Sequence, residues 1–194
     1  KHIKIEPMRW YYHCDRLGML VWQDMVNGGG KYDSLVVTAP LFTGANIKDN
    51  KYSRFSRGDE EGREQFKKEL DDMIAHLYNC VSIAVWVPFN EGWGQFDSDN
   101  VYEWFRTLDD TRFIDTTSGW FRREKSDVDS RHVYFRKVKL KGDGVKPLVL
   151  SEFGGKTYKA DGHIFNLDML GEVAAFPRIL ELAKARGIRC ILIT

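Results

Sequence analysis

The sequence predicts an α/β fold, specifically a (β/α)8 barrel that is incomplete. Short apolar runs with the composition of buried strands alternate with helical patterns or long loops, which is typical of a parallel sheet. Polar residues follow these runs, and in a barrel all such strand ends point into one mouth. About seven strands can be counted, whereas a complete barrel has eight in about 250 residues. We therefore expect the first strand and helix to be missing and the chain to be cut at strand eight. The strand-end polar residues are Asp24, Glu91, Asp115, Tyr134 and Glu152.

The composition predicts one domain over residues 1–194. The chain is 43% hydrophobic and 13% aromatic, which suffices for one sizeable core. A formal net charge of +1 gives no reason to expect a nucleic-acid partner, and no apolar run approaches the roughly 20 residues of a membrane span. No signal peptide is visible, so secreted, periplasmic and cytoplasmic locations all stay open. The cysteines are odd in number and widely spaced, and we expect buried thiols at Cys14, Cys80 and Cys190.

The first third of the chain predicts two strands around one helix. Residues 2–5 alternate as a short strand does, and Pro7 stands where a helix can begin. Residues 8–17 form the expected helix, which Gly18 ends. Residues 19–24 form the next strand, and residues 25–57 read as a long irregular segment.

The middle of the chain has clearer periodicity. Apolar residues recur at three- and four-residue steps over residues 59–78, which predicts an amphipathic helix with acidic first turns. A buried strand then ends at Glu91. Residues 97–108 predict a second helix, and residues 112–115 a short strand that runs into a polar stretch.

The last third contains the second glutamate strand. A charged surface loop is expected over residues 122–130, followed by a short strand at 132–135. A turn at 142–144 precedes the strand that ends at Glu152. Residues 172–186 predict a helix kinked or begun by Pro177, and residues 188–194 a final apolar strand.

Two strand-end glutamates, each followed by a glycine-containing turn, suggest a two-carboxylate active site. A carboxylate at the end of a buried strand is costly unless it is used or paired. One carboxylate can act as a nucleophile if it stays ionised, and another as a general acid if its pKa is lifted. Such a pair about 5 Å apart cleaves a glycosidic bond with retention of configuration. We expect Asn90 to bind the sugar hydroxyl next to the anomeric carbon, and Tyr134 to orient the nucleophile. Trp93 and Trp120 could provide flat apolar faces for a sugar ring.

Three motifs resemble those of the family-two glycoside hydrolases, the group that contains β-galactosidase, β-glucuronidase and β-mannosidase. Val85–Trp93 resembles the acid/base motif and Leu150–Gly154 the nucleophile strand. Tyr12–Trp22 resembles the signature that joins the second helix to the third strand. The motifs occur in the family's order over the whole chain.

The resemblance implies a retaining, exo-acting β-glycosidase with Glu91 as acid/base and Glu152 as nucleophile. It implies a carbohydrate substrate, and sandwich domains and barrel segments outside this chain. We expect no cofactor, and no metal site is visible in the sequence, although some relatives in the family bind a magnesium ion. Ile3 and Gly155 stand where β-galactosidase has histidines, which argues against galactose. The implied substrate-binding residues are Asn90, Asp24, Tyr134, His132, Trp120, Trp93 and Lys4.

Other interpretations stay open. Asp24 could be a helix-cap or salt-bridge residue, His132 a core histidine, and both tryptophans ordinary packing residues. A related barrel that cleaves polysaccharides internally would share the two carboxylates. A different class of function is a non-catalytic or inactive barrel fragment, because a barrel that lacks a strand exposes two edges.

Overall fold

The computed structural model describes residues 1–134 and 141–154, together with residues 181 and 185. The helix expected at 172–186, the strand expected at 188–194 and Cys190 lie outside the described residues, apart from those two positions. The described elements, in chain order, are α1 (Met8–Leu17), β1 (Val21–Asp24), α2 (Ser34–Thr43), η1 (Tyr52–Phe55), α3 (Glu60–Leu77), β2 (Ile83–Val87), β3 (Phe89–Asn90), α4 (Ser98–Leu108), β4 (Phe113–Ile114), β5 (Thr117–Ser118), β6 (Asp129–Tyr134) and β7 (Leu148–Gly154).

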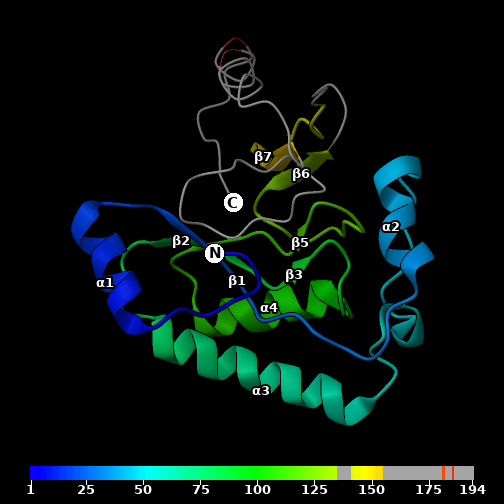
Figure 1. Cartoon of the computed structure of the whole chain (residues 1–194), viewed down its shortest axis with the longest axis horizontal. Coiled ribbons are helices and arrows are strands. Elements are labelled where there is room, and N and C mark those ends of the chain that lie inside the picture. Colours follow the sequence, from blue (N-terminus) through cyan, green and yellow to red (C-terminus); the bar gives the residue numbers. More distant parts are fainter. Residues whose placement is uncertain (135–140, 155–180, 182–184, 186–194) are drawn as a thin grey trace, which may run out of the picture.

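The strand pairs within the described residues are parallel, as the sequence predicted. β1, β2 and β4 form one sheet in that order, with Asp24 opposite Val87 and Trp86 opposite Ile114. β3 and β5 continue β2 and β4 as a second pair, and β6 pairs with β7 (Figure 1). β5 also contacts β6, so the pairs form a continuous series. Across the described residues this series does not close into a barrel.

The core lies between the strands and the helices α3 and α4. Asp59 accepts a hydrogen bond from the Gly62 N–H at 2.8 Å and so caps α3, which runs below the strands in Figure 1. The buried face of α3 has the predicted periodicity, and Phe66 stacks on Phe89 with ring centroids 5.2 Å apart. Each fully buried side chain of this kind contributes about 1.5–3 kcal/mol of transfer free energy. The buried residues of α3 are Phe66, Leu70, Met73, Ile74 and Leu77.

The predictions for α1 and for two cysteines are confirmed. α1 ends at Gly18, which has φ +68° and donates its N–H to Asp15 and Cys14 carbonyls. Cys14 and Cys80 are free and buried. Of the helices described, none is long and apolar enough to cross a membrane.

Two expectations for irregular or extended backbone were wrong. Residues 2–5 form no strand, since Ile3 has φ +39° and its N–H binds the Asp24 carboxylate instead of a neighbouring strand. Residues 25–57 are not wholly irregular, because they contain α2 and η1. α2 is apolar on most sides and has Pro40 inside it, so it lacks the amphipathic pattern that reveals a helix.

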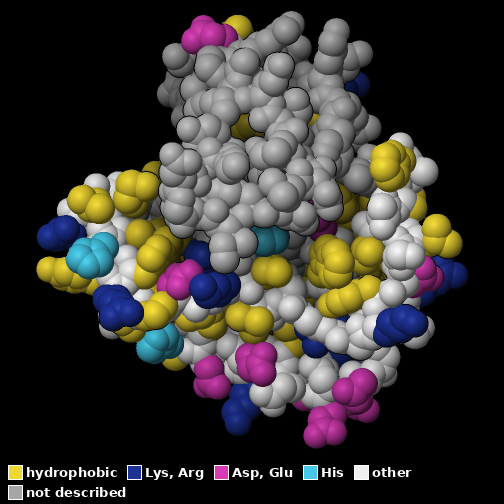
Figure 2. All heavy atoms as spheres, viewed as in Figure 1, with side chains coloured by type: hydrophobic (Ala, Val, Ile, Leu, Met, Phe, Trp, Pro, Cys, Tyr) yellow, Lys and Arg dark blue, Asp and Glu magenta, His cyan; other side chains and the backbone are white. Residues whose placement is uncertain are grey.

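A second, smaller cluster joins α2 to the segment after β5. Val36 of α2 packs with the buried side chains of Phe55 and Phe121, and Trp120 packs against them. Hydrophobic side chains are visible between α2 and the strands in Figure 2. This cluster places Trp120 at the end of β5, beside the strand-end carboxylates.

Candidate active site

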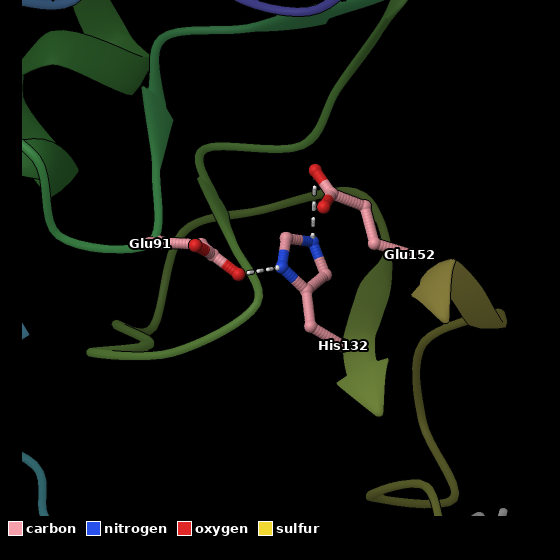
Figure 3. A group of neighbouring side chains, drawn as sticks. All are labelled: Glu91, His132 and Glu152. Atoms are coloured by element: carbon pink, nitrogen blue, oxygen red, sulfur yellow. Dashed lines mark hydrogen bonds and ion pairs between the residues drawn. The ribbon is translucent and has the colours of Figure 1, made fainter. Parts of the chain in front are cut away.

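Two glutamates that are distant in sequence meet at one edge of the sheet. One carboxylate oxygen of Glu91, one of Glu152 and a ring nitrogen of His132 all lie within 4.8 Å of one another (Figure 3). Glu91 follows β3, while Glu152 lies in β7 opposite His132 of β6. Because the described strand pairs are parallel, their carboxyl ends lie at the same edge. The expectation that the strand ends at Glu152 was wrong, because β7 continues to Gly154, which pairs with Tyr134 of β6.

The backbone at Glu91 is strained. Glu91 has φ +52°, a left-handed conformation uncommon for a residue other than glycine, and Gly92 continues it with φ +76°. The Glu91 N–H donates to the Ser118 carbonyl at 2.9 Å, which extends the register that sets Asn90 opposite Ser118. Strain of this kind costs on the order of 1–3 kcal/mol and is concentrated at functional sites.

His132 lies between the two glutamates. Its Nδ1 is 2.7 Å from Glu91 Oε1, and its Nε2 is 3.0 Å from Ser118 Oγ and 3.8 Å from Glu152 Oε1. The side chain has no exposed area. The Trp120 ring packs edge-on against it with centroids 5.8 Å apart.

Tyr134 connects both carboxylates. Its hydroxyl donates to Glu91 Oε1 at 2.8 Å and also forms a hydrogen bond with Glu152 Oε2. Burial raises the pKa of Tyr134 above its ordinary value, and the negative charges of Glu91 and Glu152 raise it further. The hydroxyl therefore stays protonated and acts as a donor.

Asp24 and His2 form a second group beside Glu152. Asp24 is 6% exposed and accepts the Ile3 N–H at 3.0 Å, and its Oδ2 is 3.2 Å from His2 Nδ1. His2 Nδ1 is also 3.7 Å from Glu152 Oε1. The hydrogen bond to Asp24 raises the pKa of His2, although burial opposes this. Sequence reasoning missed His2, although the histidine sought at position 3 was only one residue away.

Asp115 is a buried carboxyl at the same edge. It is 1% exposed, its Oδ1 accepts from the Ser130 hydroxyl at 2.9 Å, and its Oδ2 has no partner among the described residues. Burial raises the pKa of Asp115 to about 6, although the Ser130 hydrogen bond acts in the opposite direction. No cation that forms an ion pair with it is present in the part of the chain that the structure describes.

The remaining expected residues differ in their positions. Asn90 is 3% exposed and is the last residue of β3, directly before Glu91. Trp120 flanks His132, and its indole nitrogen is buried without a partner among the described residues. Trp93 packs edge-on against Tyr32 and is 39% exposed. Lys4 is directed elsewhere, because its ammonium pairs with Glu6 at 3.1 Å and not with the two glutamates.

A cavity adjoins this cluster. Its volume is about 360 Å³, within the range of small-molecule sites of roughly 300–1,000 Å³. The carboxylates of Asp24 and Glu152 and two serine hydroxyls provide part of its polar lining, whereas Glu91 is not among the lining residues. Ser118 and Ser151, two lining residues, were not singled out by the sequence analysis, because a serine in a strand carries no pattern of its own. The lining side chains that bear on the site are His2, Trp22, Asp24, Ser118, Ser151 and Glu152.

The group of Glu91, His132 and Glu152 also has the residue types of a metal site. Glu91, His132 and Glu152 present three donor atoms within 4.8 Å, a spacing that a divalent cation could bridge. Both ring nitrogens of His132 already have hydrogen-bond partners, and Tyr134 bonds to both carboxylates. The donor atoms are therefore already engaged in hydrogen bonds with one another and with their neighbours.

Comparisons with known proteins identify the family of the chain. Residues 6–170 match the model of the family described as glycosyl hydrolases family 2, TIM barrel domain. A similar solved structure is the β-glucuronidase of Parabacteroides merdae, with a TM-score of 0.46 and 19% identity over 84% of this chain and 21% of that one. No curated protein sequence matches the chain. On the family match, the chain belongs to glycoside hydrolase family 2 and to its TIM barrel domain.

Proposed function

We propose that this chain carries the catalytic centre of a retaining, exo-acting β-glycosidase. The observation that supports this most directly is the spacing of Glu91 and Glu152, whose nearest donor oxygens lie within 4.8 Å. Retaining enzymes hold their carboxyl groups about 5–5.5 Å apart, whereas inverting enzymes need about 6.5–9.5 Å to admit a water. The exo-acting mode rests on the family resemblance alone.

In the proposed first step, Glu152 attacks the anomeric carbon while Glu91 transfers its proton to the glycosidic oxygen. The bond from the anomeric carbon to the leaving oxygen breaks as the bond to the Glu152 oxygen forms, giving a covalent glycosyl-enzyme. In the second step, Glu91 takes a proton from water, whose oxygen displaces Glu152 from the anomeric carbon. Tyr134 supports this assignment, because its hydroxyl bonds to the nucleophile and orients it.

We assign the surrounding residues to the sugar. Asn90, next to the acid/base, would bind the hydroxyl beside the anomeric carbon, and Asp24 with His2 would bind hydroxyls farther around the ring. Trp120 and Trp93 would provide its apolar walls. For Lys4 to bind the sugar, its ion pair with Glu6 would have to break. We also propose that residues 1–194 form a single domain and that segments outside them complete the barrel.

The test uses the intact enzyme that contains this chain and a panel of aryl β-glycosides. Glu91→Gln and Glu152→Gln are each expected to lower kcat by about 10³-fold or more, since each removes a group on which a chemical step depends. The matched control is Glu64→Gln, the same change at a 65% exposed glutamate of α3. Activity of either site variant within tenfold of wild type contradicts the assignment.

Product analysis tests the stereochemistry and the mode of action. Proton NMR during early turnover should show the β-anomer as the first product, and an α-anomer would overturn the retaining mechanism. With azide present, Glu91→Ala should yield a β-glycosyl azide and Glu152→Ala an α-glycosyl azide. Release of single sugars from an oligosaccharide supports exo action, whereas mixed internal fragments would contradict it.

A further inference from the structure

His132 was expected to contact the sugar, but its position argues for a different role. Its side chain has no exposed area, and both ring nitrogens already have partners at 2.7 and 3.0 Å. A side chain in this position acts on substrate only through another group. The group that it contacts most closely is the carboxylate of Glu91.

Ser118 connects His132 to the backbone that carries Glu91. Its carbonyl accepts the Glu91 N–H at 2.9 Å, while its hydroxyl lies 3.0 Å from His132 Nε2. One residue of β5 thus fixes both the strand end that presents the acid/base and the ring that contacts its side chain.

The surroundings leave the ring little room to move. Gly119 has φ +92°, and a Cβ built there would stand 2.5 Å from His132 Nδ1, so the close approach depends on the missing side chain. Trp120 packs on the ring edge-on. The other polar groups near the ring are Tyr134 Oη at 3.4 Å from Nδ1, Glu152 at 3.8 Å from Nε2, and, at longer range, the Asp115 carboxyl.

We propose that His132 is a positioning residue for the acid/base carboxyl of Glu91, an inference that rests on the proposed function. In the neutral ring we place the proton on Nδ1, because its partner there, Glu91 Oε1, is a carboxyl oxygen that accepts it at 2.7 Å. Nε2 is then an acceptor, and the Ser118 hydroxyl is placed to donate to it. With Oε1 engaged as an acceptor, the proton for the leaving group is carried on Oε2.

This arrangement serves both steps of the reaction. In the first step, the Oε2 proton moves to the glycosidic oxygen, and the carboxylate that remains gains a charge-assisted hydrogen bond from Nδ1–H. In the second step, a proton from water returns to Oε2. His132 keeps its own proton throughout, so it orients Glu91 without exchanging a proton with the substrate.

The experiment compares two leaving groups in the intact enzyme. A 2,4-dinitrophenyl β-glycoside departs without protonation, whereas a 4-methoxyphenyl β-glycoside of the same sugar needs the acid. The sugar is the one that the wild-type enzyme hydrolyses in the aryl glycoside panel. We expect His132→Leu to lower kcat/KM for the methoxyphenyl substrate by about 10- to 100-fold. For the dinitrophenyl substrate we expect less than about threefold, since glycosylation then does not need a correctly held acid.

Two further variants separate positioning from packing. His132→Asn places an amide nitrogen where Nδ1 stands and should restore the methoxyphenyl rate to within about fivefold of wild type. His132→Gln places its amide nearer to the position of Nε2, so it should not restore the methoxyphenyl rate. This pair also keeps the test valid if His132→Leu fails to fold. His76→Leu, at an exposed histidine of α3, is the neutral control.

Equal losses on both substrates, or no loss on either, would overturn the positioning role. Equal rescue by Asn and Gln would overturn the assignment of Nδ1 as the donor. Glu91→Ala in the same assay distinguishes failure of the proposed function from failure of the positioning role of His132. If Glu91→Ala lacks the leaving-group dependence, the proposed function fails; if Glu91→Ala shows it and His132→Leu does not, only this inference fails.

Discussion

Two buried aspartates, one on each side of β4, have opposite ionisation behaviour. Asp109, on the amino side, is 2% exposed and accepts hydrogen bonds from Trp86 Nε1 at 2.8 Å, from the Thr111 N–H and hydroxyl, and from Arg112 at 2.6 Å. Burial alone would raise its pKa, but these donors together lower the pKa of Asp109 to about 2. Asp115, on the carboxyl side, has only serine hydroxyls as donors and no ion-pair partner among the described residues, and burial raises its pKa to about 6.

The two edges of the sheet therefore differ in how well they stabilise a buried charge. At the amino edge, a buried charge has donors and an ion-pair partner, so it contributes to stability. At the carboxyl edge, a carboxyl of equal burial is left with few donors, and a strained Glu91 lies nearby. This is the division expected of a (β/α)8 barrel, in which one edge carries the chemistry and the other serves stability.

Among the variants that compare the two edges, the largest effect is expected at the amino edge. Asp109→Ala should lower the free energy of unfolding by about 3 kcal/mol, because it leaves Arg112 and the Trp86 indole N–H without their acceptor. The measurement is urea denaturation at pH 7. Since the folded pKa lies below the unfolded one, the wild-type advantage should be full above about pH 4 and lost as the pH falls towards 2. A constant difference across that range would contradict the ionic account.

The next effect is on activity at the carboxyl edge. Gly119→Ala should lower kcat/KM for a methoxyphenyl glycoside at least about tenfold, because the new Cβ would displace the His132 ring that holds Glu91. Steady-state kinetics of the intact enzyme provide the measurement. Wild-type activity with an alanine at position 119 would show that the ring position does not matter.

A gain in stability is expected at Asp115. Asp115→Asn should raise the free energy of unfolding by about 1–2 kcal/mol at pH 7, because a buried charge with few donors is replaced by a neutral amide. The folded pKa of Asp115 exceeds the unfolded one, so the wild type loses stability as the pH rises from about 4 to above 6. The gain should therefore vanish near pH 4. A loss of stability at pH 7 would refute the comparison of the two edges.

The smallest effect is expected for a glycine at the amino edge. Gly18 has φ +68° and nothing within 4 Å of a built Cβ, so alanine there meets only backbone strain. Gly18→Ala should cost about 1 kcal/mol of stability and leave kcat unchanged. Thermal denaturation paired with an activity assay checks both. A drop in kcat would mean that the amino edge is coupled to the chemistry.

The sequence predicted those features for which a residue type at a given position has few possible structural roles. Glu91 and Glu152 could be found because an apolar strand that ends in glutamate and glycine is costly without a role. α3 could be found from its apolar period. His2 could not be found, because the left-handed turn at Ile3 that directs it to Asp24 leaves no mark in the sequence. The role of Ser118 could not be predicted either, because it depends on the register between β3 and β5.

The left-handed backbone of Glu91 has a consequence for directed evolution. Glycine adopts this conformation without the steric penalty, so Glu91→Gly would relax the turn while it removes the carboxylate. That carboxylate also accepts a hydrogen bond from Tyr134 at 2.8 Å and lies 2.7 Å from His132 Nδ1, so glycine would leave both groups without this partner. A library selected only for heat tolerance therefore weighs the backbone strain at position 91 against these two contacts, and a screen for the proposed hydrolysis in every round would show which residues keep the function.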